Sequence, residues 1–495
     1  MNDRAAFRRA RVLSTLGPAS RDPDILRELV AAGCDGVRVN FSHSSHEDAA
    51  RSVRLAREVA REAGRPVAVL ADLQGPKIRV GELDAPLEIE PGRRYLVVPE
   101  DGRGEEDDEG GPGSAARDPG ADVAARIPTT WPDLAADLSA GDRVLFDDGR
   151  IALRVIETRG RAVVLEALDE GTLHSGKGIN LPEVDVAAPS LTAKDREDAR
   201  HALDLEVDYV ALSFVRRPRD VQELKDLVDG RALVVAKIEK RQALRDLPGI
   251  LDVADGVMVA RGDLGVELDF EEVPIVQKRI LGHTRESTRL GITATQMLES
   301  MIHANRPTRA EASDVANALL DGTDVVMLSA ETAVGDYPVD AVRTMCRIIR
   351  RIERETADDA RALATPGARG ASSVHHTVAG AIAGAAAEAT ERLGAPFLVT
   401  FTRSGFTAWV ISAQRLQVPV LAVTDQPRTW NQLALAWGVV PLLLEGEPDY
   451  DVMKDFAARF ALERGLGRPG DVYVITAGVP FHVPGTTNYL RVETL

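Results

Sequence analysis

The sequence predicts an α/β protein built on a (β/α)8 barrel of the TIM type, and two observations lead to this fold class. Eight short segments rich in β-branched residues alternate with stretches of helical periodicity, and polar residues gather where these segments end. An eight-stranded doubly wound sheet has the same alternation and is the structural alternative. We favour the barrel because the polar residues recur at the carboxyl ends of the segments all the way round. The expected strands are 11–17, 37–42, 67–73, 209–214, 232–239, 256–261, 291–297 and 324–329.

The long gap between the third and fourth expected strands has a different pattern. Strands punctuated by Gly and Pro, such as 95–100, 142–158 and 162–168, predict a small β-barrel inserted here as a lid. Within it, the segment 101–122 is acidic and Gly-rich and has no apolar periodicity, so we expect a mobile loop.

A second alternating region follows a linker-like stretch after residue 350. Four short apolar segments separated by helical patterns, and a final segment at 489–495, predict a C-terminal open-sheet α/β domain. We therefore expect a barrel domain formed by 1–74 and 186–350, a lid at 75–185 and a C-terminal domain at 351–495.

Composition and charge exclude several classes of function. A net charge of −17 without a basic stripe argues against nucleic acid as a partner, although a few cations in one cleft suffice to bind a small anion. The two cysteines, Cys34 and Cys346, fit neither a disulfide framework nor a zinc motif, so we expect reduced thiols in the core. The sequence shows no apolar signal segment and no run of about 18 apolar residues that could cross a membrane. These observations predict a cytoplasmic protein without a membrane partner.

Polar side chains share faces at the ends of several expected strands. Residues two apart on a strand point the same way, which groups them into sets. Burying so many charges and hydroxyls would be costly unless they pair with each other or hold a ligand. Because active sites of barrels lie at the carboxyl ends of the strands, we expect the site there. The sets are Arg38, Asn40 and Ser42; Lys237 and Glu239; Thr293 and Thr295; and Ser329 with Glu331.

The mixture of residue types limits the chemistry. Glu239 and Asp263 are hard oxygen donors suited to Mg²⁺. Arg38, Arg79 and Lys237 are cations suited to phosphate or carboxylate oxygens. The sequence shows no His–Cys set for zinc, no Ser–His pair and no GxxxxGK[ST] loop. These residues predict phosphoryl transfer, or enolate chemistry on an anionic acid.

Long motifs, found in the same order along the chain, resemble the pyruvate kinase family. The motifs are NFSHSSHED (40–48), DLQGPKIR (72–79), GKGINLP (176–182), AKIEKRQALRDL (236–247), DGVMVARGDLGVEL (255–268), TATQMLESMI (293–302), the long segment 306–338 and GTTNYLRV (485–492). The resemblance implies Mg²⁺-dependent transfer of a phosphoryl group from phosphoenolpyruvate to ADP, giving pyruvate and ATP as the final step of glycolysis. We expect that Mn²⁺ can replace Mg²⁺.

Two other functions are weighed against this one. Another Mg²⁺-dependent barrel enzyme acting on phosphoenolpyruvate or a 2-oxo acid would lack the lid and the GKGINLP segment, and both are in the sequence. An inactive paralogue that serves as a metabolite sensor would be expected to have lost Lys237, Glu239 or Asp263, and all three are present.

The resemblance assigns roles to the catalytic set. Arg38 would hold the transferred phosphoryl group, and Lys237 would neutralise its charge in the transition state. Glu239 and Asp263 would bind Mg²⁺, and the backbone of residues 260–262, with Gly262, would receive the substrate carboxylate. The proton network would consist of Thr295, near the carbon that is protonated, with Ser329 and Glu331. Which group delivers the proton is left open.

Further residues are matched to the nucleotide and to a monovalent cation. The resemblance places Asn40, His43, Arg79 and Lys177 on the nucleotide side, and Asn40, Ser42, Asp72 and the carbonyl of Leu73 around a monovalent cation. Ser44 and Glu183 stand where the family commonly has glycine, which puts nucleotide affinity and lid motion in question.

Lys77 concerns the same cation. Members of the family with glutamate at this position commonly require K⁺, whereas members with lysine there commonly do not. The residues that resemble the lysine type are Leu73, Gln74, Lys77 and Val80. An ammonium near Asp72 would supply the charge that K⁺ otherwise brings. We therefore expect that K⁺ is not required.

The C-terminal domain carries a candidate effector site. Thr402, Ser404 and Thr407 lie in a turn before a helix, which suits a phosphate, although a helix cap with a Gly turn has the same pattern. The resemblance favours an allosteric sugar phosphate or nucleotide, with the loop 478–488 closing over it. It also implies a homotetramer.

Overall fold

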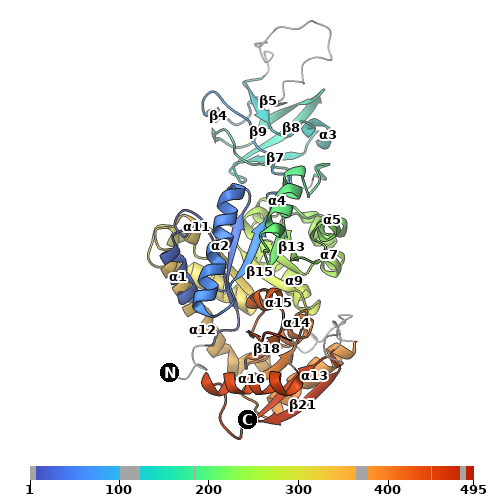
Figure 1. Ribbon diagram of the computed structural model, residues 1–495. Coiled ribbons are helices and arrows are strands. Elements are labelled where there is room, and N and C mark those ends of the chain that lie inside the picture. Colours follow the sequence, from blue (N-terminus) through green and yellow to red (C-terminus); the bar gives the residue numbers. More distant parts are fainter. Residues whose placement is uncertain (1–6, 101–122, 183, 364–376, 447–448, 480–486) are drawn as a thin grey trace.

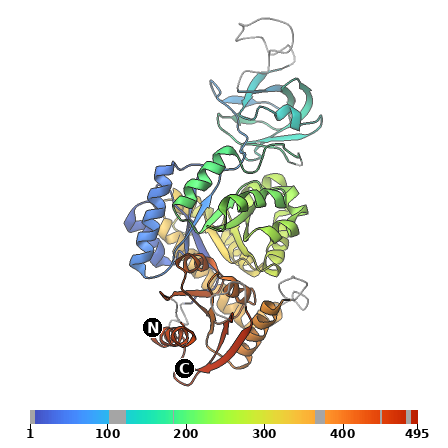
Figure 2. The ribbon, with the colours of Figure 1, turned by 45° about the vertical axis from the view of Figure 1, so that its right-hand side comes forward.

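The computed structural model describes residues 7–100, 123–182, 184–363, 377–446, 449–479 and 487–495. Three parts are stacked one above another, with the barrel between a β-rich lid and the C-terminal domain (Figure 1). Figure 2 shows the same order from a second direction, with the lid projecting away from the C-terminal domain. The segment 101–122, expected to be a mobile loop, lies outside the described residues.

Among the described residues, eight parallel strands form a closed barrel, which confirms the predicted fold class and excludes the doubly wound sheet. β1 pairs with both β2 and β16, so the hydrogen bonds run round the whole ring. Every strand overlaps a segment expected from its β-branched residues. In ring order they are β1 (Arg11–Thr15), β2 (Gly36–Asn40), β3 (Ala68–Asp72), β12 (Tyr209–Leu212), β13 (Leu233–Ile238), β14 (Gly256–Ala260), β15 (Leu290–Ala294) and β16 (Val325–Leu328).

Several helices round the ring begin at residues whose side chains accept a free backbone N–H group. The hydroxyl of Ser45 accepts the N–H of Asp48 at the start of α2, and Thr192 and Thr308 form reciprocal capping boxes at α4 and α10. The helices of the barrel are α1 (Pro23–Ala32), α2 (His46–Ala63), α4 (Ala193–Asp204), α5 (Pro218–Val228), α6 (Arg241–Arg245), α7 (Leu247–Val253), α8 (Arg261–Glu267), α9 (Val273–Glu286), η2 (Glu299–Ile302), α10 (Arg309–Leu320), α11 (Ala330–Ala333) and α12 (Pro338–Leu363).

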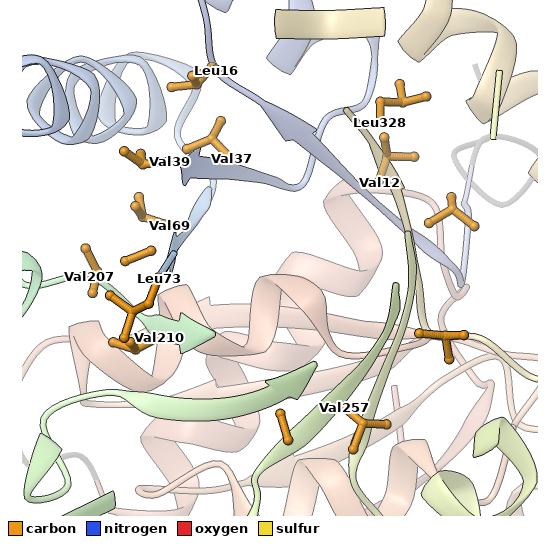
Figure 3. Packing of buried hydrophobic residues seen from close by; sticks show 14 of the residues in the cluster. Val12, Leu16, Val37, Val39, Val69, Leu73, Val207, Val210, Val257 and Leu328 are labelled. Atoms are coloured by element: carbon orange, nitrogen blue, oxygen red, sulfur yellow. The ribbon is translucent and has the colours of Figure 1, made fainter. Parts of the chain in front are cut away.

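The barrel core has an outer and an inner layer because side chains alternate along each strand. Val12, Val37, Val69 and Val210 belong to the outer cluster, which also contains helix residues, and Figure 3 shows several of its members round the ring of strands. Leu13, Leu70, Met258 and others form a separate cluster that fills the interior. The two cysteines, Cys34 and Cys346, are both buried and free, as expected.

Aspartates secure the amino ends of alternate strands. In the described part of the chain, Asp35, Asp208, Asp255 and Asp324 directly precede β2, β12, β14 and β16. One oxygen of each accepts the backbone N–H of the strand before it in the ring, from Val12, Val69, Val234 and Gly291, at 2.7–2.8 Å. Each carboxylate also pairs with a cation: Asp35 with Arg8, Asp208 with Arg57, Asp255 with Lys225 and Asp324 with Arg415.

The C-terminal domain closes this end of the barrel. Leu435 is completely buried and belongs to the cluster of side chains that fills the barrel interior. Arg415, which comes from the same domain, donates to Asp324 and to the carbonyl of Gly322. The barrel core is therefore completed by a second domain.

The lid is all-β, as expected, but its strands form two sheets where the sequence predicted a small β-barrel. Its described strands build a six-stranded sheet in the order β11-β7-β8-β9-β5-β6, with a two-stranded sheet of β10 and β4. The elements are β4 (Leu87–Ile89), β5 (Arg94–Pro99), β6 (Ala125–Thr129), α3 (Leu134–Asp137), β7 (Arg143–Phe146), β8 (Ile151–Arg159), β9 (Ala162–Ala167), β10 (Gly171–Leu173) and β11 (Ile179–Asn180).

The C-terminal domain is an open α/β sheet, which confirms the prediction. Its described strands run in the order β19-β18-β17-β20-β21, with β21 antiparallel at the edge. The elements are α13 (Val378–Arg392), β17 (Leu398–Phe401), α14 (Phe406–Ser412), β18 (Val420–Thr424), α15 (Pro427–Gln432), η3 (Leu433–Leu435), β19 (Val439–Leu443), α16 (Tyr450–Glu463), β20 (Val472–Ala477) and β21 (Tyr489–Thr494). No helix among the described residues is both long and apolar enough to cross a membrane.

Candidate active site

Most residues singled out in the sequence lie at the carboxyl ends of the barrel strands, on the side where the chain continues into the lid (Figure 1). Arg38 lies on β2, Asp72 ends β3, and Lys237 lies on β13. Thr295 follows β15 directly, and Ser329 follows β16. The alternation of side chains along strands therefore brings residues from distant parts of the sequence to one end of the ring.

Two cations and two carboxylates are paired at the centre of this cluster. Arg38 Nε donates to Asp72 Oδ2 at 2.7 Å, and Lys237 Nζ lies 3.3 Å from Asp72 Oδ1 and 2.9 Å from Glu239 Oε1. The carboxylate side chains are nearly inaccessible, with 2% and 1% of their surface exposed. Lys237 also donates to Ser213 Oγ at 2.8 Å. Buried charges of opposite sign thus compensate one another.

The pKa directions follow from this arrangement. Burial raises the pKa of Glu239, the ammonium of Lys237 opposes this, and the charge of Asp263 adds to it. For Asp72, burial also disfavours the charged form, but Lys237 and Arg38 outweigh it and the pKa is lowered. Burial disfavours the charged form of Lys237 too, yet Asp72 and Glu239 raise its pKa. Lys237 therefore keeps its proton, and Asp72 stays ionised at neutral pH.

A second arc of the site is formed by α8 and the turn after β15. Thr295 has φ 66°, a left-handed conformation that is rare for a β-branched residue. Its Oγ1 accepts the N–H of Gly262 at 2.9 Å, and its carbonyl accepts from Arg261 Nη2 at 2.6 Å. Arg261 is held in turn by both oxygens of Asp314. Asp263, half-buried on the first turn of α8, lines a pocket between barrel and lid.

Ser329 and Glu331 are joined where β16 ends. Glu331 is buried, and its oxygens accept the backbone N–H of Ser329 at 2.6 Å and of Leu298 at 3.1 Å. The hydroxyl of Ser329 is buried and has no hydrogen-bond partner among the described residues. This hydroxyl is therefore available to a ligand or a water molecule.

The residues matched to the nucleotide come from both sides of the cleft. Asn40 and His43 lie at the end of β2, whereas Arg79 and Lys177 lie side by side on the lid, where Arg79 donates to the carbonyl of Gly176 at 2.8 Å. Lys177 pairs with Asp147 at 2.7 Å. Burial and then the charges of Arg79, Lys77 and Arg38 lower the pKa of His43. The barrel and lid residues therefore share one electropositive region.

Two positions depart from the family pattern beside this region. The hydroxyl of Ser44 accepts from Arg21 Nη2 at 3.1 Å. Glu183 lies outside the described residues.

The residues matched to a monovalent cation already have partners in this structure. Asn40 Oδ1 accepts the N–H of Ser42 at 3.1 Å, and the carbonyl of Leu73 accepts from Ser213 Oγ at 2.7 Å. Asp72 pairs with Arg38 and Lys237, as described above.

The position of Lys77 differs from the expected one. Among the described residues, the ion pairs of Asp72 do not include Lys77, which instead lines the pocket between barrel and lid together with Asp148 and Gly178. Gly75, with φ 71°, turns the chain between Asp72 and Lys77 and directs the lysine toward the lid.

The candidate effector residues lie at the carboxyl edge of the C-terminal sheet. Gly405, with φ 82°, precedes α14. Thr407 is buried with its Oγ1 2.7 Å from Thr487 Oγ1, Thr402 is half-buried and Ser404 is exposed. Of the loop expected to close over this turn, residues 480–486 lie outside the described residues.

Two residues of the site were not predicted from the sequence. Ser213 bridges Lys237 and the carbonyl of Leu73, and the backbone N–H of Phe214 donates to Glu239 Oε2 at 2.8 Å. Ser213 follows β12 at the same strand end as the other site residues, so its position was a usable signal. Phe214 contributes a backbone group that every residue except proline carries, and nothing in its side chain indicates that role.

Nearly the whole chain is similar in sequence to known proteins. The family model described as the pyruvate kinase barrel domain matches residues 7–342, and the model described as the pyruvate kinase alpha/beta domain matches residues 380–493. Pyruvate kinase 2 of Synechocystis sp. is 41% identical, over 99% of this chain and 79% of the relative. The pyruvate kinases of Mycobacterium tuberculosis and Corynebacterium glutamicum are 43% and 42% identical, each over 99% of this chain and 98% of the relative.

Proposed function

Because the chain belongs to the pyruvate kinase family and transfers a phosphoryl group between phosphoenolpyruvate and ADP, we propose that the paired charges at the barrel's carboxyl end are its catalytic centre. The observation that carries this proposal is the cluster formed by Arg38, Asp72, Lys237 and Glu239. Its two cations, Arg38 and Lys237, are suited to bind an anionic substrate. In the proposal Arg38 binds the phosphoryl group and Lys237 opposes the charge that it develops during transfer. The backbone of residues 260–262, including Gly262, receives the substrate carboxylate.

Glu239 and Asp263 are the proposed ligands of Mg²⁺. Their fit is supported by the buried Oε1 of Glu239, whose contact with Lys237 is an ion pair without hydrogen-bond geometry. Two carboxylates suit an ion that keeps waters and substrate oxygens as its other ligands. When bound, Mg²⁺ would polarise the substrate oxygens, and Mn²⁺ is a suitable replacement.

Thr295, Ser329 and Glu331 are the proposed proton network. Thr295 contacts the substrate near the carbon that is protonated, and the unpaired hydroxyl of Ser329 supports a role in passing a proton toward it. Glu331 holds the backbone of Ser329 in place.

Asn40, His43, Arg79 and Lys177 are the proposed nucleotide contacts. The lowered pKa of His43 supports this, because the same cations that disfavour its protonated form favour a polyphosphate. Arg79 belongs to the lid, so its charge reaches the phosphates as the lid approaches the barrel.

Independence from K⁺ is proposed as well, with the lysine-type pattern at Leu73, Gln74, Lys77 and Val80 as its support. Asn40, Ser42, Asp72 and Leu73 are the proposed cation pocket, and the ammonium of Lys237 beside Asp72 already supplies positive charge there. Replacing K⁺ by a bulky inert cation should leave the rate nearly unchanged, and a large loss of rate would contradict the proposal.

Thr402, Ser404 and Thr407 are the proposed effector site for a sugar phosphate or nucleotide. The exposed Ser404 beside the start of α14 supports this assignment. A panel of sugar phosphates and AMP should shift the half-saturating phosphoenolpyruvate concentration, and Ser404→Glu should abolish the shift. We further propose a cytoplasmic homotetramer, with domain boundaries at residues 74/75, 185/186 and 350/351.

A lactate-dehydrogenase-coupled assay with phosphoenolpyruvate, ADP and Mg²⁺ tests the central proposal. Turnover that is lost in Glu239→Gln and Arg38→Met, with both variants folded, is the expected result. Failure of the wild-type chain to form pyruvate would favour the sensor alternative, and activity with a 2-oxo acid but not with ADP would favour the other barrel enzymes.

A further inference from the structure

The loop that follows β12 contains a residue in a strained conformation. Phe214 has φ 54°, a left-handed conformation that bulky residues adopt when their surroundings impose it. Its N–H donates to Glu239 Oε2 at 2.8 Å, so the conformation of Phe214, together with the ion pair between Oε1 and Lys237, sets the orientation of that carboxylate. Whatever holds Phe214 in place therefore also orients Glu239.

The same loop holds both connections between the barrel and the lid. On the outgoing side, the ring of Phe214 packs so closely on Gly75 that a Cβ there would lie 2.7 Å from its Cδ2. On the returning side, the carbonyl of Phe214 accepts from Ser190 Oγ at 2.9 Å, and Arg216 donates to the carbonyls of Val186 and Ala188. The position of Phe214 is thus tied to both crossings of the lid.

Lys240 fixes the ring of Phe214 from the other side. Its Nζ lies 5.7 Å from the ring centroid, within the range of a cation–π contact. The same Nζ is anchored by Glu267 Oε1 on α8 at 2.5 Å. The side chains of Lys240 and Glu267 are 13% and 1% exposed, and a cation–π contact counts for more where water is excluded. Glu267 lies one helical turn after Asp263, so Lys240 links the helix that carries Asp263 to the loop that orients Glu239.

We propose that Lys240 is a positioning residue for the metal site, acting through Phe214. By holding the aromatic ring, it keeps the Phe214 N–H aimed at Glu239 and keeps the ring seated on Gly75. Lys240 thereby links the orientation of a metal ligand to the position of the chain where it crosses into the lid. The inference rests on the proposed role of Glu239 as a metal ligand.

The first test measures metal binding by the full chain without substrate. Mn²⁺ is titrated, and the free ion is counted by electron paramagnetic resonance. Lys240→Met keeps the side-chain stem and removes the ammonium, and we expect roughly threefold to thirtyfold weaker Mn²⁺ binding, the range that corresponds to one cation–π contact. Lys240→Arg keeps a cation that can face both the ring and Glu267, so it should restore binding.

The second test measures amide hydrogen exchange in the metal-free protein. If Lys240 seats Phe214, exchange in Lys240→Met should rise at residues 75–78 and 184–190, the two crossings, and Lys240→Arg should suppress the rise. Lys225→Met is the matched control, because Lys225 makes an ion pair with Asp255 at 2.8 Å at the opposite end of the barrel. This control should change neither Mn²⁺ affinity nor exchange at the crossings.

The outcomes separate this inference from the proposed function. If Glu239→Gln weakens Mn²⁺ binding while Lys240→Met leaves both binding and exchange unchanged, the metal assignment stands and the role of Lys240 is wrong. If Glu239→Gln binds Mn²⁺ as the wild type does, the metal assignment fails and the inference falls with it. If Lys240→Met does not fold, Glu267→Gln replaces it, and normal Mn²⁺ affinity in that variant overturns the proposal.

Discussion

Replacing Lys237 by methionine tests the central charge cluster. The substitution keeps most of the side-chain length and removes the ammonium that lies 3.3 Å from Asp72 and 2.9 Å from Glu239. Removing one partner of a buried ion pair costs about 3–5 kcal/mol, because it leaves an uncompensated charge. Asp72 keeps Arg38 at 2.7 Å, whereas Glu239 keeps the N–H of Phe214 at 2.8 Å. We therefore expect a loss of about 3 kcal/mol in the free energy of unfolding, the lower end of that range, arising mainly at Glu239.

The same substitution should reduce turnover far more than the loss of stability explains. Removing one group that stabilises transition-state charge typically lowers kcat by about 10²–10³-fold. Turnover is measured in the coupled assay on protein shown to be folded by urea titration. Lys225→Met is the matched control, since it removes an ammonium from Asp255 at the amino end of the strands and should destabilise without lowering kcat. Folded Lys237→Met with kcat within about threefold of the wild type would refute the proposed role, because that loss is far below the range expected for such a group.

The pH dependence of the stability loss identifies its source. Without Lys237, the pKa of Glu239, already raised by burial, should rise further. A carboxyl group whose folded pKa exceeds its unfolded value favours the folded state at low pH, and this contribution is lost as the pH rises through the folded pKa. The deficit of the variant should therefore be larger at about pH 8 than at about pH 5. An equal deficit at both would show that an unpaired carboxylate is not its cause.

Three further predictions follow from the packing. Leu435→Ala should lower the free energy of unfolding, measured by urea titration, by about 2–5 kcal/mol, because it opens a cavity in the barrel core. The control Leu462→Ala changes a side chain that is 41% exposed and should alter the free energy of unfolding little. Arg415→Ala should separate the unfolding of the C-terminal domain from that of the barrel in calorimetry, because it leaves Asp324 without its cation; a single unchanged transition would contradict this. Burial raises the pKa of the Cys34 thiol to about 11 and also raises the pKa of the Cys346 thiol. Neither thiol should therefore react with a thiol reagent at about pH 8 until urea unfolds the chain. Rapid reaction of the native protein would contradict this prediction.

The fold was predictable from the sequence where local pattern and burial agree. Most residues of the barrel strands are buried, and each strand contains at least one β-branched residue, so hydrophobicity and propensity point to the same element. The lid strands β4, β6, β10 and β11 were not predicted. Three of them, β4, β10 and β11, are two or three residues long and are defined by their partners rather than by their own sequence. The fourth, β6, contains Pro128, which weakens a strand pattern. Whether the lid sheet closes on itself is likewise decided by long-range pairing.

The site was predictable as far as the spacing of side chains along strands could show it. Lys237 and Glu239 were placed on one face by that rule, and their ion pair at 2.9 Å agrees with it. Arg38 and Lys237, expected at the same end of the barrel, both contact Asp72. Lys77 was expected near Asp72, but the ion pairs of Asp72 among the described residues are with Arg38 and Lys237. The left-handed Gly75 turns the chain between Asp72 and Lys77, and such a turn cannot be placed from spacing alone. The role of Phe214 depends on a single backbone angle, which no property of its side chain indicates.

The two ends of the barrel strands use charge in opposite ways. At the amino ends, the short repeat of a small or apolar residue followed by aspartate, at 34–35, 207–208, 254–255 and 323–324, was visible in the sequence but was not recognised. No buried oxygen of these aspartates lacks a partner among the described residues, which is what a purely structural role requires. At the carboxyl ends, Asp72 Oδ1, Glu239 Oε1 and Ser329 Oγ are buried and make no hydrogen bond within the described part of the chain. Leaving such atoms without a hydrogen bond costs stability, and a ligand that supplies one recovers it. At the amino ends, Arg8 Nη1 and Arg415 Nε are also buried without a hydrogen bond among the described residues. The two ends therefore differ in their buried carboxylate oxygens, which in the described part of the chain all have partners at the amino ends but lack hydrogen bonds at Asp72 and Glu239 of the proposed catalytic end.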